Sequence, residues 1–301
     1  MRMIKMKDIN YLKENDVDIE QSLELFGDVE TYNETLKEFK NGITGKLEQI
    51  KKYYEEEDMP NYAIFVHSLK SDCKYFGFMK LASIAYDHEM HSKSNNLKFV
   101  KEHYDELLAE GERVKEIVFT YFNEYPSTEE GEDDIYDTDE DIEERYEDTE
   151  SSFDEETDDE IEETEETSSE KITDGNIILV VDDSEVVRSF VKKIFNDSYE
   201  IASANNGSEA IQIIKAHKDD DLIQAILLDL NMPKVDGFDV LDYLSDNDLL
   251  EKMPVTIISG ESSSEAINRA FTYGIVDMIN KPFSEEKISQ AVIKTMMRKK
   301  Q

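Results

Sequence analysis

The chain has few of the residues that would crosslink it or draw it to nucleic acid. Cys73 is its one cysteine among 301 residues, which excludes an internal disulfide framework and favours a reducing compartment. Lysine and arginine number 33 against 72 aspartates and glutamates, and the formal net charge is −39. Because the parts before and after the acidic segment, residues 1–126 and 174–301, are each net negative, and the Arg298-Lys299-Lys300 tail is too short to reverse this, we expect no binding to nucleic acid or to an anionic membrane surface.

Long apolar runs are also missing. No stretch approaches the length of a membrane span, and residues 1–10 lack the apolar core of a signal peptide. We therefore expect a cytoplasmic protein that does not insert into membranes. A length of 301 residues has room for two ordinary domains.

The negative charge is concentrated in residues 127–173. This segment carries 25 acidic and 2 basic side chains, whereas residues 1–126 and 174–301 each have a net charge of −8. Like charges at this density repel one another, and the scattered Ile, Tyr and Phe offer little to bury, so we expect a disordered linker. The charge either confers solubility alone or docks a basic partner, and the sequence leaves both possibilities open.

Apolar residues before the linker recur at helical spacing, with little strand signal. They predict a first helix that ends at Phe26 and a long helical pattern from Tyr32 to Ile50. A further helix ends at Phe76, and two more cover residues 79–92 and 97–122. Gly42 and Gly45 are expected to divide the long pattern into two helices. Pro60 suits the first turn of the helix that ends before Gly77. Short connections between long helices predict an all-α, antiparallel four-helix bundle over residues 1–126.

The apolar period changes at Asn176. Ile177 to Val181 form a β-branched run, as expected for a strand buried on both faces. Further strand patterns lie at 199–202, 225–228, 255–258 and 277–279, and helical patterns lie at 186–195, after Gly207, from 237, at 263–273 and at 284–298. This alternation predicts an α/β domain over residues 174–301, with a doubly wound, five-stranded parallel sheet.

Chemically active side chains stand where these strands end: Asp182 and Asp183, Asp229, Ser259 and Lys281. Ligands bind at the carboxyl ends of the strands in such sheets. Three converging carboxylates need a compensating cation, and an oxygen-rich site of this kind suits Mg²⁺. A carboxylate nucleophile would form an acyl phosphate there, while a hydroxyl and an ammonium group hold the phosphoryl oxygens. A single aspartate at a strand end is commonly a helix cap. Capping does not explain why four strand ends carry two aspartates, one aspartate, a serine and a lysine in that order.

Residues 176–298 resemble a response-regulator receiver domain, which has a flavodoxin-like fold. The matching stretches are 180–184 (VVDDS), 228–233 (LDLNMP), 236–237 (DG), 258–260 (ISG) and 280–283 (NKPF). The resemblance implies that Asp229 is the phosphoacceptor, that Ser259 is the hydroxyl switch and that Lys281 binds the phosphate. It also implies that Mg²⁺ is held by Asp183, Asp229 and the backbone carbonyl of Asn231, with Asp182 acting through water.

Two further expectations follow from this resemblance. The Lys281–Pro282 bond should be cis, and Met278 replaces the family's usual switch aromatic, which could alter the coupling to output. A phosphatase of the haloacid-dehalogenase type is disfavoured, since it needs an aspartate where this chain has Asn231.

His67 is set apart from the other four histidines by its neighbours in the sequence. Its apolar neighbours Tyr62, Phe65, Leu69, Cys73 and Phe76 define a buried stripe. His67 lies about 200° from Phe65 and Leu69, so we expect it on the solvent face beside Lys70, Ser71 and Lys74. An exposed imidazole beside ammonium groups suits a phosphohistidine. His88 and His91 lack an evident third zinc ligand and are interpreted as ordinary polar helix positions.

Residues 67–71 (HSLKS), with Gly77 ten residues after the histidine, resemble a histidine-phosphotransfer (HPt) domain over about residues 16–122. Leu81, Ala85 and Glu89 also fit the family's pattern. The resemblance implies that His67 carries a phosphoryl group, with Lys70 beside it. Ser71 stands where glycine is common, at a position where space is needed.

Together the two resemblances predict a two-component phosphorelay protein that passes a phosphoryl group between His67 and Asp229. No GxxxxGK[ST] loop occurs, so we expect no kinase activity; the partners would be a sensor histidine kinase, another receiver or another HPt protein. The alternative is a non-catalytic signalling adaptor that uses the bundle, the acidic linker and the receiver as docking surfaces. The kinase, the direction of phosphoryl flow, exchange within one chain and the oligomeric state stay open.

Overall fold

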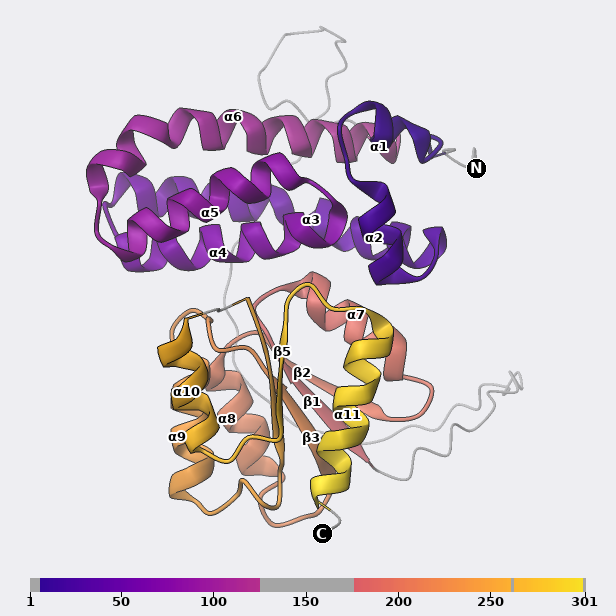
Figure 1. Ribbon diagram of the computed structural model, residues 1–301, viewed down its shortest axis with the longest axis vertical. Helices are drawn as coiled ribbons and strands as arrows, with labels where there is room; N and C mark the ends of the chain where they lie inside the picture. Colours follow the sequence, from indigo (N-terminus) through magenta and orange to yellow (C-terminus); the bar gives the residue numbers. More distant parts are fainter. Residues whose placement is uncertain (1–5, 125–175, 261–262, 300–301) are drawn as a thin grey trace, which may run out of the picture. The chain divides into compact units, whose positions relative to one another are not determined.

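The computed structural model describes residues 6–124, 176–260 and 263–299 (Figure 1). The predicted disorder of residues 127–173 concerns a segment outside the described residues. The described residues on the two sides of the gap at 125–175 belong to a single compact unit. None of the described helices is long and apolar enough to cross a membrane.

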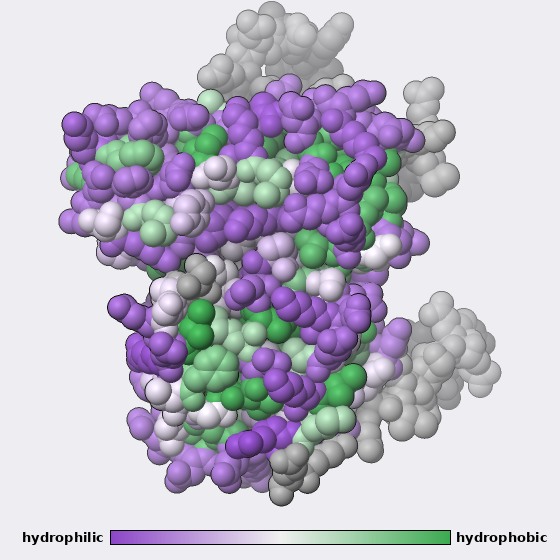
Figure 2. Space-filling model, in the orientation of Figure 1, coloured by the Kyte–Doolittle hydropathy of each residue, from purple (hydrophilic) through white to green (hydrophobic). Residues whose placement is uncertain are grey.

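Six helices form the described part of the N-terminal region: α1 (Asn10–Glu14), α2 (Ile19–Phe26), α3 (Val29–Glu55), α4 (Met59–Phe76), α5 (Met79–Lys93) and α6 (Leu97–Tyr121). The four long helices pack α4 against α3 and α5, and α6 against α3 and α5. The predicted all-α region is therefore confirmed, with two short helices before the four long ones. On the face drawn in Figure 2 the surface of these helices is mostly hydrophilic.

The expected break at Gly42 and Gly45 is wrong, because α3 runs through both as one helix. Both glycines are exposed, and a Cβ built on either would meet nothing within 4 Å. Phe39, Ile43 and Leu47 meanwhile continue one buried face past them. A glycine costs about 1 kcal/mol in a helix interior, and burying one large apolar side chain contributes about 1.5–3 kcal/mol. The continuous apolar face therefore decides the outcome.

The two ends of α4 lie at residues that favour the start and the end of a helix. Asp58 caps the first turn, Pro60 lies within that turn, and the helix ends at Gly77 in the left-handed region with φ 79°. A Cβ at Gly77 would lie 2.3 Å from the carbonyl oxygen of Asp18. Only glycine meets both demands, and this end anchors the helix that carries His67.

The C-terminal region is a five-stranded parallel sheet in the order β2-β1-β3-β4-β5, which confirms the predicted fold. The strands are β1 (Ile177–Val181), β2 (Glu200–Ala204), β3 (Ile223–Leu228), β4 (Val255–Ser259) and β5 (Asp277–Asn280). The helices are α7 (Glu185–Phe195), α8 (Gly207–Ala216), α9 (Gly237–Asp246), α10 (Ser264–Thr272) and α11 (Glu285–Lys299). Figure 1 shows α8, α9 and α10 on one face of the sheet and α7 and α11 on the other.

Aromatic side chains of the two regions meet in one buried cluster. The ring centroids of Phe26 and Phe190 lie 5.0 Å apart, and those of Tyr75 and Phe283 lie 5.8 Å apart in a T-shaped pair. The hydroxyl of Tyr75 accepts a hydrogen bond from the backbone N–H of Phe283 at 3.3 Å. Apolar burial on this scale is the main favourable term in packing two such regions together.

Candidate functional site

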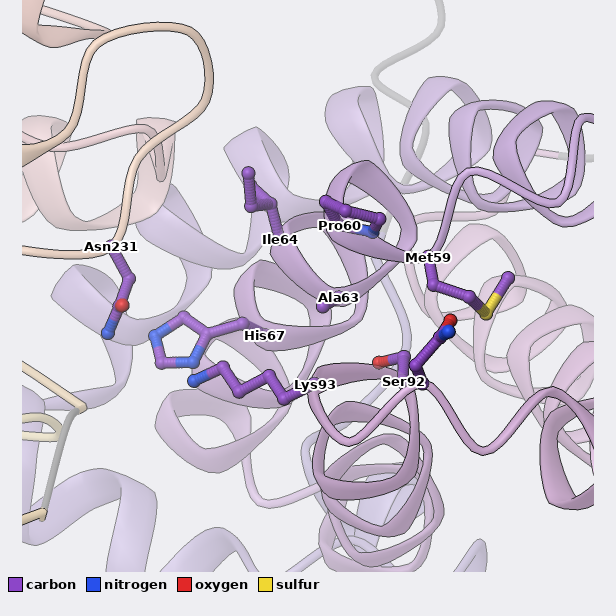
Figure 3. A pocket seen from close by; sticks show the side chains of 9 residues that line it. Met59, Pro60, Ala63, Ile64, His67, Ser92, Lys93 and Asn231 are labelled. Carbon is purple, nitrogen blue, oxygen red and sulfur yellow. The ribbon is translucent and has the colours of Figure 1, made fainter.

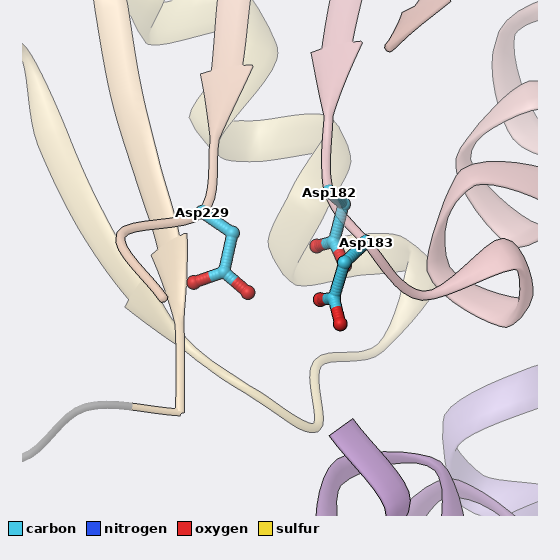
Figure 4. Close-up of side chains that lie close together, drawn as sticks. All are labelled: Asp182, Asp183 and Asp229. Carbon is cyan, nitrogen blue, oxygen red and sulfur yellow. The ribbon is translucent and has the colours of Figure 1, made fainter. Parts of the chain in front are cut away.

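Three carboxylates converge at the carboxyl end of the sheet. Asp182 and Asp183 follow β1 and Asp229 follows β3, on either side of the point where the strand order reverses. Figure 4 shows their carboxylates turned toward one another, and one oxygen of each lies within 4.8 Å of the others. The convergence predicted from the sequence is therefore present.

Asp229 is fully buried and accepts hydrogen bonds from three neighbours. Lys281, just after β5, donates from Nζ to Oδ2 at 2.5 Å. Ser259, at the end of β4, donates from Oγ to Oδ1 at 3.1 Å, and the backbone N–H of Asn231 donates to the same oxygen at 3.1 Å. Lys281 Nζ also lies 2.6 Å from Oδ2 of Asp182. The fold thus gathers four of the predicted site residues around one carboxylate.

The pKa values of Asp182 and Asp183 are raised, whereas that of Asp229 is lowered. Burial raises the pKa of Asp182 and of Asp183, and the charge of Asp229 adds to the rise against the opposing ammonium of Lys281. Burial acts on Asp229 in the same direction, but Lys281 and His67 outweigh it and lower the pKa of that group. Asp229 is therefore the carboxylate best suited to stay ionised, which a nucleophile requires.

The donor set fits a hard divalent cation. Oxygen ligands from a few carboxylates and a backbone carbonyl are what Mg²⁺ prefers, and three carboxylates this close together repel one another unless a cation compensates their charge. Among the described residues this is the one cluster of at least three His, Cys, Asp or Glu side chains with metal-binding spacing.

His67 is not exposed, and that prediction is wrong. The side chain lies on α4, with a residue exposure of 2%, and its neighbours Lys70 and Ser71 are buried as well, although Lys74 is partly exposed. The helical geometry was correct, since Leu69 and Cys73 face the bundle core. The opposite face of α4 is buried because residues of the C-terminal region pack against it.

Glu89 on α5 holds one nitrogen of the His67 ring. Nδ1 lies 2.7 Å from Oε1 of Glu89, and because an ionised carboxylate only accepts, Nδ1 carries the proton. Burial alone would raise the pKa of Glu89, but His67 and Lys70 hold it well below its usual range. Lys70 donates to Oε2 of Glu89 at 2.5 Å, so its ammonium lies on the Nδ1 side of the ring.

The other ring nitrogen faces the C-terminal region. Nε2 of His67 is buried and has no hydrogen-bond partner among the described residues. A Cβ built on Gly260, the residue after Ser259, would lie 3.3 Å from it. In Figure 3, His67 and Asn231 lie at the same end of a pocket of about 480 Å³. The lone pair of Nε2 is therefore turned toward the end of the sheet that carries Asp229.

A second polar network was missed by sequence reasoning. Asp72 on α4 accepts a hydrogen bond from Ser184 Oγ at 2.6 Å and pairs with Lys46 on α3, whose Nζ also donates to Ser68 Oγ at 2.9 Å. Ser184 is the N-cap of α7. The network joins residues that are far apart in the sequence, so no local pattern could have revealed it.

The structure also places the remaining predicted residues. His88, predicted as an ordinary polar helix position, is fully buried in α5, where its Nδ1 lies 2.7 Å from the Tyr62 hydroxyl and its Nε2 lies 3.2 Å from the carbonyl oxygen of His103. Met278 is partly buried in β5. The Lys281–Pro282 bond is cis, as predicted.

Comparison with known proteins covers the C-terminal part of the chain. Residues 178–293 match the protein family described as the response regulator receiver domain. Hybrid signal transduction histidine kinase D of Dictyostelium discoideum is 26% identical over 133 residues, which are 44% of this chain and 8% of that protein. The probable C4-dicarboxylate response regulator DctR of Priestia megaterium is 34% identical over 119 residues, which are 38% of this chain and 49% of that protein.

A solved structure shares this likeness. The signal receiver domain of a putative Luxo repressor protein from Vibrio parahaemolyticus is 29% identical, covering 42% of this chain and 92% of that chain with a TM-score of 0.38. The chain spans less than half the length of the two curated relatives named above. The strand order, the residues at the strand ends and the family match identify residues 178–293 as a response regulator receiver domain, which indicates two-component signalling.

Proposed function

We propose that this chain is a phosphorelay protein in which a phosphoryl group passes between Asp229 of the receiver and His67 of an HPt-like bundle. In this proposal residues 1–126 form the phosphohistidine domain, residues 127–173 form an acidic linker and residues 174–301 form the receiver. In this proposal these residues transfer the phosphoryl group and do not generate it from ATP. A sensor histidine kinase, another receiver or another HPt protein supplies or removes the phosphoryl group.

The observation that carries the proposal is the state of the His67 ring. One nitrogen is occupied by Glu89, and the other is buried, unpaired among the described residues and turned toward the receiver. A histidine buried only for packing would have both nitrogens satisfied, as His88 does. The arrangement of His67 suits a nucleophile held in one tautomer.

The proposed transfer balances without any further reactant. The lone pair of Nε2 attacks the phosphorus of the Asp229 acyl phosphate, a P–N bond forms and the P–O bond to Asp229 breaks. Asp229 leaves as a carboxylate, which Lys281 and Ser259 already bind. The imidazole gains positive charge, and the carboxylate of Glu89 at Nδ1 stabilises it. The reverse reaction uses the same groups.

Asp182, Asp183, Asp229 and the carbonyl of Asn231 would hold the Mg²⁺. When bound, the ion neutralises charge on the phosphoryl oxygens. Ser259 and Lys281 act on the same group from the ends of β4 and β5.

The proposal is tested by labelling the whole protein with radioactive acetyl phosphate and Mg²⁺, and comparing the wild type with His67→Gln and Asp229→Asn. We expect acid-labile label at His67 in the wild type, acid-stable acyl label at Asp229 in His67→Gln, and no label in Asp229→Asn. A wild type with no label at His67 would contradict the proposed transfer, and absence of label from both residues would leave the chain as a docking adaptor.

A further inference from the structure

Ser71 lies one helical turn after His67 and has an unusual hydroxyl group. The residue is 4% exposed, and Oγ has no hydrogen-bond partner among the described residues. Leaving a buried hydroxyl unsatisfied costs about 1–3 kcal/mol. A hydroxyl that served packing alone would not be expected to remain in that state.

Other buried or part-buried hydroxyls in these helices donate a hydrogen bond to a backbone carbonyl of the same helix or of its N-cap. Ser22, Thr35 and Ser92 each donate to the carbonyl oxygen four residues earlier, at 3.0, 2.8 and 2.7 Å. For Ser71 that acceptor would be the carbonyl of His67, and the bond is not made. Its hydroxyl is therefore kept free for a different acceptor.

The position of the hydroxyl indicates which acceptor. A Cβ built on Gly260 would lie 3.5 Å from Ser71 Oγ and 3.3 Å from His67 Nε2, so both atoms border the same point beside the end of β4. Ser259, the residue before Gly260, donates to Asp229. Ser71 thus lies on the bundle side of the path between the two phosphoryl-carrying atoms.

We propose that Ser71 is a catalytic residue of the transfer, donating a hydrogen bond from Oγ to an oxygen of the phosphoryl group as it moves between Asp229 and His67. The inference rests on the proposed function and adds a donor to it. In phosphoryl transfer, charge is spread over three oxygens, and donors fixed in advance stabilise it.

The two bundle lysines nearest the His67 ring, Lys70 and Lys93, both pair with Glu89. The ammonium of Lys70 lies 3.3 Å from Nδ1, on the side of the ring away from Nε2. The receiver supplies Lys281 and Ser259, which both contact Asp229. In this proposal Ser71, whose Oγ is unpaired among the described residues, donates to the phosphoryl group from the side of the histidine.

The test compares Ser71→Ala and Ser71→Thr with the wild type in the full chain. The rate at which label moves from Asp229 to His67 is measured in a single turnover. We expect Ser71→Ala to slow transfer by about 10- to 100-fold and Ser71→Thr, which keeps a hydroxyl, to retain most of the rate. Ser22→Ala is the matched control, because it removes a buried hydroxyl that has an ordinary partner, and its rate should equal that of the wild type.

Two further readouts separate catalysis from structure. The thermal midpoint of Ser71→Ala should be equal to or higher than that of the wild type, since an unsatisfied polar group is removed. His67 should stay as protected from diethyl pyrocarbonate as in the wild type. An unchanged transfer rate in Ser71→Ala, or a slower rate accompanied by loss of that protection, would overturn the role of Ser71 alone. A wild type that transfers no label to His67 would overturn the proposed function and this role with it.

Discussion

Glu89 and His67 form a buried pair in which the carboxylate fixes the ring: Oε1 lies 2.7 Å from Nδ1, and the pKa of Glu89 is held well below its usual range. The pair assigns the proton to Nδ1 and leaves the lone pair on Nε2. A reactive histidine needs this tautomer if Nε2 is to attack phosphorus.

Glu89→Gln should therefore slow transfer to His67 by at least about tenfold, because an amide no longer fixes the tautomer or stabilises the charged ring. Single-turnover transfer and ¹⁵N NMR of the ring measure the two effects. Glu112→Gln is a matched control on an exposed ion pair with Lys115. An unchanged rate together with an unchanged tautomer in Glu89→Gln would show that Glu89 has no such role.

Asp72 connects α4 to both Ser184 and Lys46, and its side chain is only 4% exposed. Asp72→Ala removes both contacts and leaves the ammonium of Lys46 without the Asp72 carboxylate. For buried pairs, such a change lowers the free energy of unfolding by about 3–5 kcal/mol. We expect the packing over His67 to loosen and diethyl pyrocarbonate to modify His67 faster in the variant, as measured by mass spectrometry.

His103, with a side chain 44% exposed, provides the internal standard for this reaction. Glu20→Ala removes an exposed partner of Lys13 and should leave His67 protected. If His67 were modified at the same rate in Asp72→Ala and in the wild type, the contact with Ser184 would not hold the two regions together.

Gly45 offers a stability test of α3. Its position is helical, exposed and open, so Gly45→Ala should raise the free energy of unfolding by about 0.5–1 kcal/mol in chemical denaturation. Gly77→Ala should lower the free energy of unfolding, because Gly77 has a positive φ and lies against the backbone of Asp18. A destabilised Gly45→Ala would mean that the helix needs flexibility there.

His88 gives a pH dependence with a defined sign. Burial lowers its pKa from 6.5 to about 4. The unfolded chain therefore binds a proton on this residue at a higher pH than the folded chain does. The contribution of His88 to stability is complete above pH 6.5 and is lost as the pH falls toward 4, by about 3 kcal/mol. Unfolding free energies of wild type and His88→Gln, measured between pH 7 and 4, should diverge by this amount. Parallel curves would contradict the burial of a neutral ring.

The sequence predicted much of the receiver because its signals are local. A β-branched run such as Ile177–Val181 marks a strand, and parallel topology then brings Asp182, Asp229 and Lys281 to one edge without further information. The ends of α4 were likewise set by Pro60 and Gly77.

The errors arose where two distant parts of the chain meet. Helical periodicity placed His67 opposite Leu69 correctly, but it could not show that a second apolar surface, which includes Phe283, covers that side. The network of Lys46 and Asp72 with Ser184 was invisible for the same reason. At Gly45 the low helix propensity of one glycine predicts a break, but the continuous buried face of Phe39, Ile43 and Leu47 keeps α3 in one piece.

The most direct test of transfer between Asp229 and His67 is ³¹P NMR of the wild type after addition of acetyl phosphate and Mg²⁺, at several protein concentrations. We predict a phosphohistidine signal that needs both residues and grows with a first-order rate independent of protein concentration, because donor and acceptor belong to one compact unit. Failure of the phosphohistidine signal to form, or its persistence in Asp229→Asn, would contradict the account.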